Sequence, residues 1–272
     1  MQVQLLGHRT DLIFPRFEGE ITDRGDYLVI RTPTNPLFYW GNYLLFDSPP
    51  GPGDCERWMR LFAAEIGTPP QVDHLVFAWD RAEKGDAAPF LEAGFSLSEN
   101  ITLAADSLGE PPHGLNTDIE ISPARADADW QAVIDIQVSL REEGHNEDGY
   151  RRFEQLRFAR YRRMSQAGRG EWFLARDRAS GRVAACLGIF AEGPLARYQS
   201  VVTLPEFRRR GICSALLVHA ARHALTRLGA QTLVIQADPE GPALNLYRSL
   251  GFQPVETAYG LERWGSAQAG EK

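Results

Sequence analysis

The sequence has few cysteines, few lysines and no long apolar run, and each absence narrows the possibilities. Its 272 residues include three cysteines, Cys55, Cys186 and Cys213, without a C-x-x-C spacing, so neither a disulfide framework nor a structural zinc site is expected. The longest apolar run, 183–191, is far shorter than the roughly 20 residues that span a bilayer. The N-terminal segment has no basic stretch followed by an apolar run, so we expect no secretory signal, a cytoplasmic location and no membrane partner.

Positive charge comes almost wholly from arginine, since Lys84 and Lys272 are the only lysines. Residues 1–115 carry 8 Lys and Arg against 17 Asp and Glu, and residues 116–272 carry 21 against 19, which together give the net charge of −7. A nucleic-acid partner is not expected, because binding phosphates requires a concentrated positive face. The exception is 151–163, with six arginines and one glutamate among apolar residues. It predicts an amphipathic helix with a solvated basic face, with anion or nucleic-acid contact as the alternative.

A stretch rich in proline and glycine, 107–117, predicts a linker between two domains, 1–115 and 116–272. Strands and helices alternate in both parts, which predicts an α/β fold with a mixed sheet. In the second part we expect strands over 118–122, 171–176, 182–190, 197–204 and 232–237, and helices over 128–140, 150–166 and 211–228. In the first part we expect strands over 27–31, 38–46 and 72–79, and a helix over 54–66.

The two parts share a short internal match. Residues 90–95, followed by Glu99, are similar to residues 247–252, followed by Glu256, at a separation of 157 residues. The identities are few, so chance agreement is the alternative. The matching order of elements around the two segments favours a degenerate duplication.

One segment, 201–217, carries a chemical signal. A predicted strand ends, the chain turns through Pro205, and an arginine-rich loop with a glycine opens directly into an apolar-faced helix. The first N–H groups of a helix have no internal partners, and the helix dipole attracts anions to that end. Gly211 lets the backbone approach a phosphate, and the preceding arginines add positive charge. The segment therefore predicts a pyrophosphate site that is neither a Walker A loop nor a G-x-G-x-x-G fingerprint.

Two motifs, in this order, resemble those of the GCN5-related N-acetyltransferase (GNAT) superfamily. Arg208-x-x-Gly211-x-Cys213 is similar to Q/R-x-x-G-x-G/A, with cysteine in the last place. Residues 243–252, ALNLYRSLGF, are similar to A-x-x-L-Y-x-x-x-G-F, and Glu240 stands where the family often has asparagine. The resemblance covers roughly 118–262. It implies the GNAT fold, with a complete catalytic domain over 116–272 and a smaller, degenerate GNAT-like domain over 1–115.

The resemblance implies an acyltransferase that transfers the acetyl group of acetyl-CoA, its cosubstrate, to an amine in a ternary complex. It implies these coenzyme-binding residues: Val201, Val202, Thr203, Arg208, Arg209, Arg210, Gly211, Ile212, Cys213 and Ser214. The backbone near Val201 and Thr203 would bind the pantetheine arm, and an N–H near Val202 would stabilise the oxyanion. Tyr247 would protonate the departing thiolate. The alternative is a noncatalytic acyl-CoA-binding regulatory module, against which the presence of Tyr247 argues.

The predicted acceptor is a primary amine on a small molecule or peptide. In the resembling family the connection between the first two helices borders the acceptor site, and here that connection, 141–149, holds four carboxylates. The candidate substrate-binding residues are Glu142, Glu143 and Glu147, with an outward-facing solvated loop as the alternative. Glu171 and Glu192 are rival candidates for the general base.

Two other features receive a structural interpretation. His219 and His223 have the i,i+4 spacing of zinc ligands, but neither a H-E-x-x-H glutamate nor a third ligand accompanies them, so no metal is expected. Cys213 lies where a helix start and arginines would lower a thiol pKa, yet we interpret it as a small residue rather than a reactive thiol. The sequence does not predict the oligomeric state.

Overall fold

The computed structural model describes residues 1–111, 114–141 and 146–264, and the chain divides into two compact units. The described part of unit 1 comprises residues 1–101, 146–153 and 256–264, and that of unit 2 comprises 102–111, 114–141 and 154–255. Strands β5 (Ser96–Ala105) and β11 (Gln253–Trp264) and helix α6 (Glu147–Gln166) each have residues in both units. The domain boundary expected between residues 115 and 116 stays a prediction.

Unit 1 is built on a sheet in which three strands, Tyr27–Arg31, Tyr43–Phe46 and His74–Trp79, are almost continuously apolar, as expected for strands buried on both faces. Its neighbouring strands follow the order β1-β2-β3-β4-β11, and only β3 and β4 are parallel. Its further elements are α1 (Leu6–Asp11), α2 (Ile13–Phe17), β1 (Glu20–Asp23), β2 (Tyr27–Arg31), β3 (Tyr43–Phe46), α3 (Asp54–Glu65), β4 (His74–Trp79) and α4 (Ala88–Glu92). An aromatic core joins α3 to the sheet, because Trp58 stacks on Phe46 with ring centroids 3.8 Å apart.

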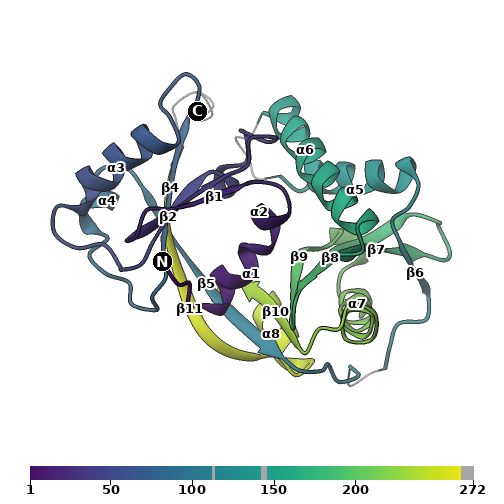
Figure 1. Ribbon diagram of the computed structural model, residues 1–272. Coiled ribbons are helices and arrows are strands. Elements are labelled where there is room, and N and C mark those ends of the chain that lie inside the picture. The colour runs from purple at the N-terminus through teal and green to yellow at the C-terminus, as the bar shows by residue number, and fades with distance from the viewer. Residues whose placement is uncertain (112–113, 142–145, 265–272) are drawn as a thin grey trace. The chain divides into compact units, whose positions relative to one another are not determined.

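Unit 2 contains β6 (Ile119–Pro123), α5 (Asp127–Ser139), β7 (Gly170–Asp177), β8 (Val183–Glu192), β9 (Leu195–Thr203), α7 (Ile212–Arg227), β10 (Thr232–Ala237) and α8 (Ala243–Ser249). Its strand order is β5-β10-β9-β8-β7-β6, with β9 and β10 parallel and β6 to β9 antiparallel. Helices α5 and α6 cover one face of this sheet and α7 covers the other (Figure 1). Adjacent residues of β7 show the two faces, since Trp172 packs on Tyr161 of α6 and Phe173 on His219 of α7. The predicted α/β class is confirmed.

Most predicted elements are present with ends shifted by a few residues, and the strand over 232–237 is confirmed without a shift. The strand expected over 38–46 is confined to Tyr43–Phe46, because Tyr39–Gly41 form a 3-10 turn. Strand β5 was not expected from its polar sequence, SLSENITLAA. Of the expected linker, the described residues belong to unit 2, where the N–H of Gly109 donates to the carbonyl oxygen of Leu250 at 2.9 Å.

The basic helix predicted over 150–166 is present as α6, but its charged residues are not all solvated. Glu154 is fully buried and accepts two hydrogen bonds of 2.8 Å from Arg157, whose side chain is 14% exposed. Arg160 is buried as well. The prediction of a wholly solvated basic face is therefore wrong. The buried carboxylate and guanidinium compensate each other, which allows both to leave water.

The internal match between residues 90–95 and 247–252 extends to the backbone. Each segment ends a short helix, α4 or α8, and leads into a long strand, β5 or β11. The N–H of Phe95 donates to the carbonyl oxygen of Phe90 at 3.0 Å, and the N–H of Phe252 donates to that of Tyr247 at 3.2 Å. The glycine before each phenylalanine has a positive φ, 84° and 108°. Similar sequence thus forms the same helix-to-strand turn at both places, as a duplication would produce.

Candidate functional site

Two parallel strands of unit 2 separate partway along their length. Strands β9 and β10 pair only between residues 195–197 and 232–234, although β9 continues to Thr203 and β10 to Ala237. No further pair between them occurs in the described chain. Backbone groups beyond Arg197 and Val234 therefore border an opening between the two strands. An extended ligand could bind there in the manner of an added strand.

A bulge in β9 lies beside this opening. Cys186 of β8 pairs with Val202, and Gly188 pairs with Gln199, so that two residues of β9, Ser200 and Val201, lie opposite one residue of β8. Ser200 has a φ of 44°, which is unusual for a residue with a side chain. A β-bulge bends its strand and redirects the backbone groups next to it. It therefore alters the direction of β9 at the residues predicted to bind the pantetheine arm.

Helix α7 begins directly after β9 and the turn that follows it. Its N-cap is Gly211, with a φ of 71°, and its first hydrogen bond runs from the N–H of Ala215 to the carbonyl oxygen of Gly211 at 3.1 Å. Among the described residues, nothing accepts a hydrogen bond from the N–H groups of residues 212–214. A Cβ placed on Gly211 would have no protein atom within 4 Å. The helix start thus offers free donors and an open backbone, which suit a pyrophosphate.

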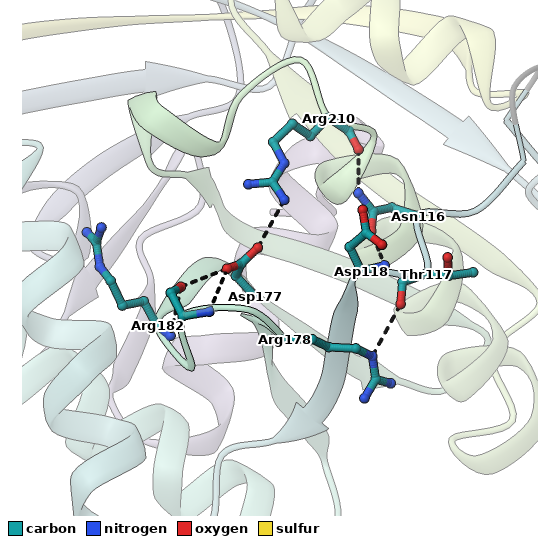
Figure 2. A network of polar contacts seen from close by, with 8 residues as sticks. Asn116, Thr117, Asp118, Asp177, Arg178, Arg182 and Arg210 are labelled. Atoms are coloured by element: carbon teal, nitrogen blue, oxygen red, sulfur yellow. Dashed lines mark hydrogen bonds and ion pairs between the residues drawn. The ribbon is translucent and has the colours of Figure 1, made fainter.

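The arginines of the loop differ in their contacts. The guanidinium of Arg210 donates to the carboxylate of Asp177 at 3.0 Å, as Figure 2 shows. Arg208 donates from Nε to the carbonyl oxygen of Thr203 at 3.1 Å. All three arginines, Arg208, Arg209 and Arg210, are exposed. Positive charge is thus available at the start of α7, where no acidic residue occurs in the first turn.

Three side chains meet where β9, α7 and α8 come together: Thr203, Cys213 and Tyr247. Burial raises the pKa of the Cys213 thiol to about 11. Burial also raises the pKa of Tyr247, which is 5% exposed, and the neighbouring Cys213 adds to this increase. Tyr247 is therefore a neutral phenol that holds its proton. A thiol with so high a pKa is not nucleophilic at neutral pH, which favours the small-residue interpretation of Cys213.

Comparison with known proteins addresses the same part of the chain. The model of the acetyltransferase (GNAT) family matches residues 130–252, a range that contains the opening, the start of α7 and Tyr247. Residues 130–252 are a GNAT domain. The fold of this family supports acyl transfer from an acyl-CoA. Comparison with curated proteins gives no match.

Solved structures share the fold over nearly the whole chain. A conserved protein of unknown function from Staphylococcus epidermidis is 14% identical, with a TM-score of 0.69 over 92% of this chain and 95% of that one. A GCN5-related N-acetyltransferase from Kribbella flavida is 16% identical, with a TM-score of 0.63 over 93% of each chain. A tandem GNAT protein from the clavulanic acid biosynthesis pathway is 14% identical, with a TM-score of 0.50 over 79% of this chain and 69% of that one.

Of the three carboxylates predicted to bind the acceptor, the structure describes only Glu147. Glu142 and Glu143 lie outside the described residues. Glu147 belongs to unit 1, where it is exposed in the first turn of α6 and pairs with Arg151 at 3.8 Å. Glu171 binds Arg125 through two contacts of 2.6 and 2.8 Å, and Glu192 ends β8. The ion pair with Arg125 weakens the case for Glu171 as a general base.

The two histidines of α7 have a packing role. The rings of His219 and His223 lie 4.8 and 5.3 Å from that of Phe173, edge to face, and burial lowers the pKa of both. No group of three metal-binding side chains occurs among the described residues. None of the helices in the described part of the chain has the length and apolar sequence needed to cross a membrane.

Sequence reasoning missed three residues that shape the GNAT site: Asn116, Asp177 and Ser200. Asn116 and Asp177 contact the arginine loop from distant parts of the chain, and Ser200 forms the bulge. The sequence carries no signal for Ser200, because serine has no preference for a positive φ. The sequence indicates a linker that includes Asn116 and a turn at Ser180-Gly181, but it does not show that Asn116 and Asp177 contact Arg210.

Proposed function

We propose that this protein is an acetyl-CoA-dependent N-acetyltransferase that acts on a primary amine. The observation that carries the proposal is that the β9–β10 pairing ends before the strands do. Helix α7 begins after β9, and no described group accepts a hydrogen bond from its first N–H groups. Acetyl-CoA supplies the acetyl group as a thioester, which an amine can attack directly.

Main-chain groups perform most of the proposed binding. N–H groups of Gly211, Ile212, Cys213 and Ser214 hold the pyrophosphate, and the exposed guanidinium groups of Arg208 and Arg209 add charge. Backbone groups of Val201 and Thr203 bind the pantetheine arm as a neighbouring strand would, and the N–H of Val202 donates to the oxygen that becomes negative during transfer. Gly211 is required because a side chain there would project into the space where the phosphates lie.

Tyr247 is the proposed general acid. Its buried phenol is neutral, so it can donate a proton to the sulfur that leaves when the acetyl group is transferred. Cys213, its neighbour, is neutral as well and leaves no competing negative charge beside the phenol.

The proposed acceptor site includes the connection 141–149. Its carboxylates would attract a protonated amine and could take up the proton that the amine loses before attack. Replacing Glu142, Glu143 and Glu147 together by glutamine is expected to raise the KM for the amine. Unchanged KM and kcat would assign these three residues to a solvated loop.

The N-terminal half, 1–115, is proposed to be a degenerate copy that binds no coenzyme. Parallel pairing of β3 and β4 runs to the last residue of β3, and the N–H of Asp80 extends it by donating to the carbonyl oxygen of Phe46 at 2.8 Å. The loop before α3, residues 47–54, contains three prolines, which have no N–H, and no arginine. Both features differ from the open strands and the arginine loop of the GNAT domain.

The deciding experiment measures binding and turnover on the full chain. Calorimetry with coenzyme A is expected to give saturable binding, and a panel of amines, amino acids, peptides and aminoglycosides with acetyl-CoA is expected to reveal an acceptor above the hydrolysis background. Failure to bind coenzyme A at millimolar concentration would reject the proposal. Binding with no turnover on the panel would favour the noncatalytic acyl-CoA-binding module.

A further inference from the structure

The three consecutive arginines of the loop lie in three different environments. Arg208 donates back to β9 through the carbonyl oxygen of Thr203. Arg209 has a φ of 59°, is exposed, and makes no hydrogen bond or ion pair with any described residue. Arg210 is held on both its backbone and its side chain. If all three arginines only supplied charge to one phosphate site, their contacts would not need to differ in this way.

Arg210 is fixed by groups from two other segments of unit 2 (Figure 2). The side-chain amide of Asn116 donates to the carbonyl oxygen of Arg210 at 2.6 Å. The guanidinium of Arg210 donates to Oδ1 of Asp177 at 3.0 Å and lies 5.5 Å from the centre of the Phe207 ring. The residue just before the N-cap Gly211 is therefore held in place from outside the loop.

The two anchoring residues are themselves fixed. Oδ2 of Asp177 accepts from the hydroxyl and the N–H of Ser180, at 2.7 and 3.0 Å, and Asp177 is only 4% exposed. These bonds from Ser180, followed by the bond from Arg210, hold the pKa of Asp177 below its usual range. Oδ1 of Asn116 accepts from the N–H of Asp118 at 2.7 Å. Asn116, Asp177 and Arg210 are called the loop network below.

The charges within the loop network argue against a direct role of Arg210 in phosphate binding. A carboxylate 3.0 Å from a guanidinium cancels most of its field at longer range. Considered as a charge alone, Asp177 would repel an anionic ligand at the start of α7. Its benefit must therefore lie in geometry, because fixing Arg210 fixes the direction of the free N–H groups that follow.

We propose that the loop network is a positioning device for the pyrophosphate site, and that Arg209, rather than Arg210, is the arginine of the loop that contacts the phosphates. This inference rests on the proposed function. It assigns Asn116, Asp177 and Arg210 as positioning residues and Arg209 as a binding residue. It also explains why an acidic residue lies so close to a site for an anion.

The decisive variant is Asp177→Asn, because the two interpretations predict changes of opposite sign. Asparagine can still accept from Ser180 but presents an N–H₂ group to Arg210, so loss of positioning is expected to raise the Kd for coenzyme A about 10-fold. A purely electrostatic role for Asp177 would lower the Kd. The matched control is Asp118→Asn, which removes the same charge nearby from a side chain with no bond to Arg210, and it is expected to leave the Kd unchanged.

Steady-state kinetics and a second ligand separate positioning from general damage. Asp177→Asn is expected to raise the KM for acetyl-CoA while kcat at saturation stays the same. Arg209→Ala is expected to raise the Kd for coenzyme A about 10-fold. The Kd for acetyl-pantetheine, which lacks the pyrophosphate, is expected to stay the same. If Asp177→Asn does not fold, Asn116→Asp takes its place, because it replaces the donor to the Arg210 carbonyl by an acceptor.

The outcomes distinguish this inference from the proposed function. Wild-type protein that does not bind coenzyme A would reject the proposed function. Wild-type protein that binds, together with an Asp177→Asn or Asn116→Asp variant of equal or higher affinity, would reject the positioning role alone. An Arg209→Ala variant that binds coenzyme A as tightly as wild type would reject the role given to Arg209.

Discussion

Tyr247 lies in a helix of seven residues, α8, and keeps 5% of its surface exposed. Burial raises its pKa above the value of about 10 that a free phenol has. The protonated form, which is the acid, therefore persists to a higher pH than in a free phenol. The side chain can supply a proton without being titrated itself near neutral pH.

Tyr247→Phe is expected to lower kcat about 100-fold, because general acid catalysis commonly contributes that much or more. The factor is expected to be the same at pH 7 and pH 9, since a raised pKa keeps the phenol protonated at both. Measuring kcat for both proteins at the two pH values tests this. A difference that disappears at pH 9 would mean that the phenol ionises well below pH 9, which would contradict a raised pKa.

Gly211→Val is expected to weaken the binding of coenzyme A. It is also expected to destabilise the fold by about 1–2 kcal/mol, because a residue with a side chain is strained in the left-handed conformation. Gly229, at the other end of α7, is a matched control, because its φ is 72° and a Cβ there also meets no protein atom. Gly229→Val should lose similar stability but bind coenzyme A normally. Thermal unfolding and calorimetry compare the two variants, and equal affinities would contradict the role of Gly211.

At the scale of elements, helix α6 combines a solvated and a buried set of charges. The sequence of 151–163 could not separate them, because a helical period places charged residues at known angles without showing which angle meets another element. Glu154, which is fully buried, and Arg157, whose side chain is 14% exposed, form an ion pair three residues apart on this helix. Their attraction is effective there because little water screens it.

Arg157→Met is expected to lower the free energy of unfolding by about 3 kcal/mol or more, because it removes the guanidinium charge and two hydrogen bonds from the buried Glu154 carboxylate. Arg152→Met is the control on the same helix, since Arg152 is exposed, and it should change stability by less than about 0.5 kcal/mol. Chemical denaturation of both variants tests this. Equal stabilities would show that Glu154 is compensated by other groups.

The elements of unit 2 were largely predictable, whereas the register of their strands was not. Helix α7 has an apolar face and a glycine at each end, and strand β10 is an apolar run between polar turns, so both are encoded locally. The bulge at Ser200 and the three-residue pairing of β9 with β10 depend on contacts between distant segments. The loop network is a further example, since its bonds join Arg210 to residues 33 and 94 positions away.

At the scale of the whole chain, the motifs of the GNAT domain and the weak repeat predicted the family and the fold. The division into units could not be predicted, because β5, β11 and α6 contribute to both units and no local signal marks an exchanged segment. The repeated turn after α4 and α8 supports an origin by duplication. Among the described residues, the pairing of β9 and β10 ends before the strands do, whereas that of β3 and β4 runs to the end of β3.

Coenzyme A is therefore expected to bind with a stoichiometry of one per chain. In the N-terminal half the β3–β4 pairing runs to the end of β3, and the loop before α3 contains three prolines and no arginine. Calorimetry at saturation measures this number directly. Two molecules per chain would show that the N-terminal half has kept a site.

The early end of the β9–β10 pairing also has a consequence for hydrogen exchange. Amides that point into the opening have no strand partner, so in free protein their hydrogens should exchange with deuterium much faster than those between β8 and β9. An occupant that pairs with these amides would slow their exchange at residues 199–203 and leave the rest of β9 unchanged. Hydrogen exchange would then show, residue by residue, whether a ligand occupies the opening, even before an acceptor for the acetyl group is known.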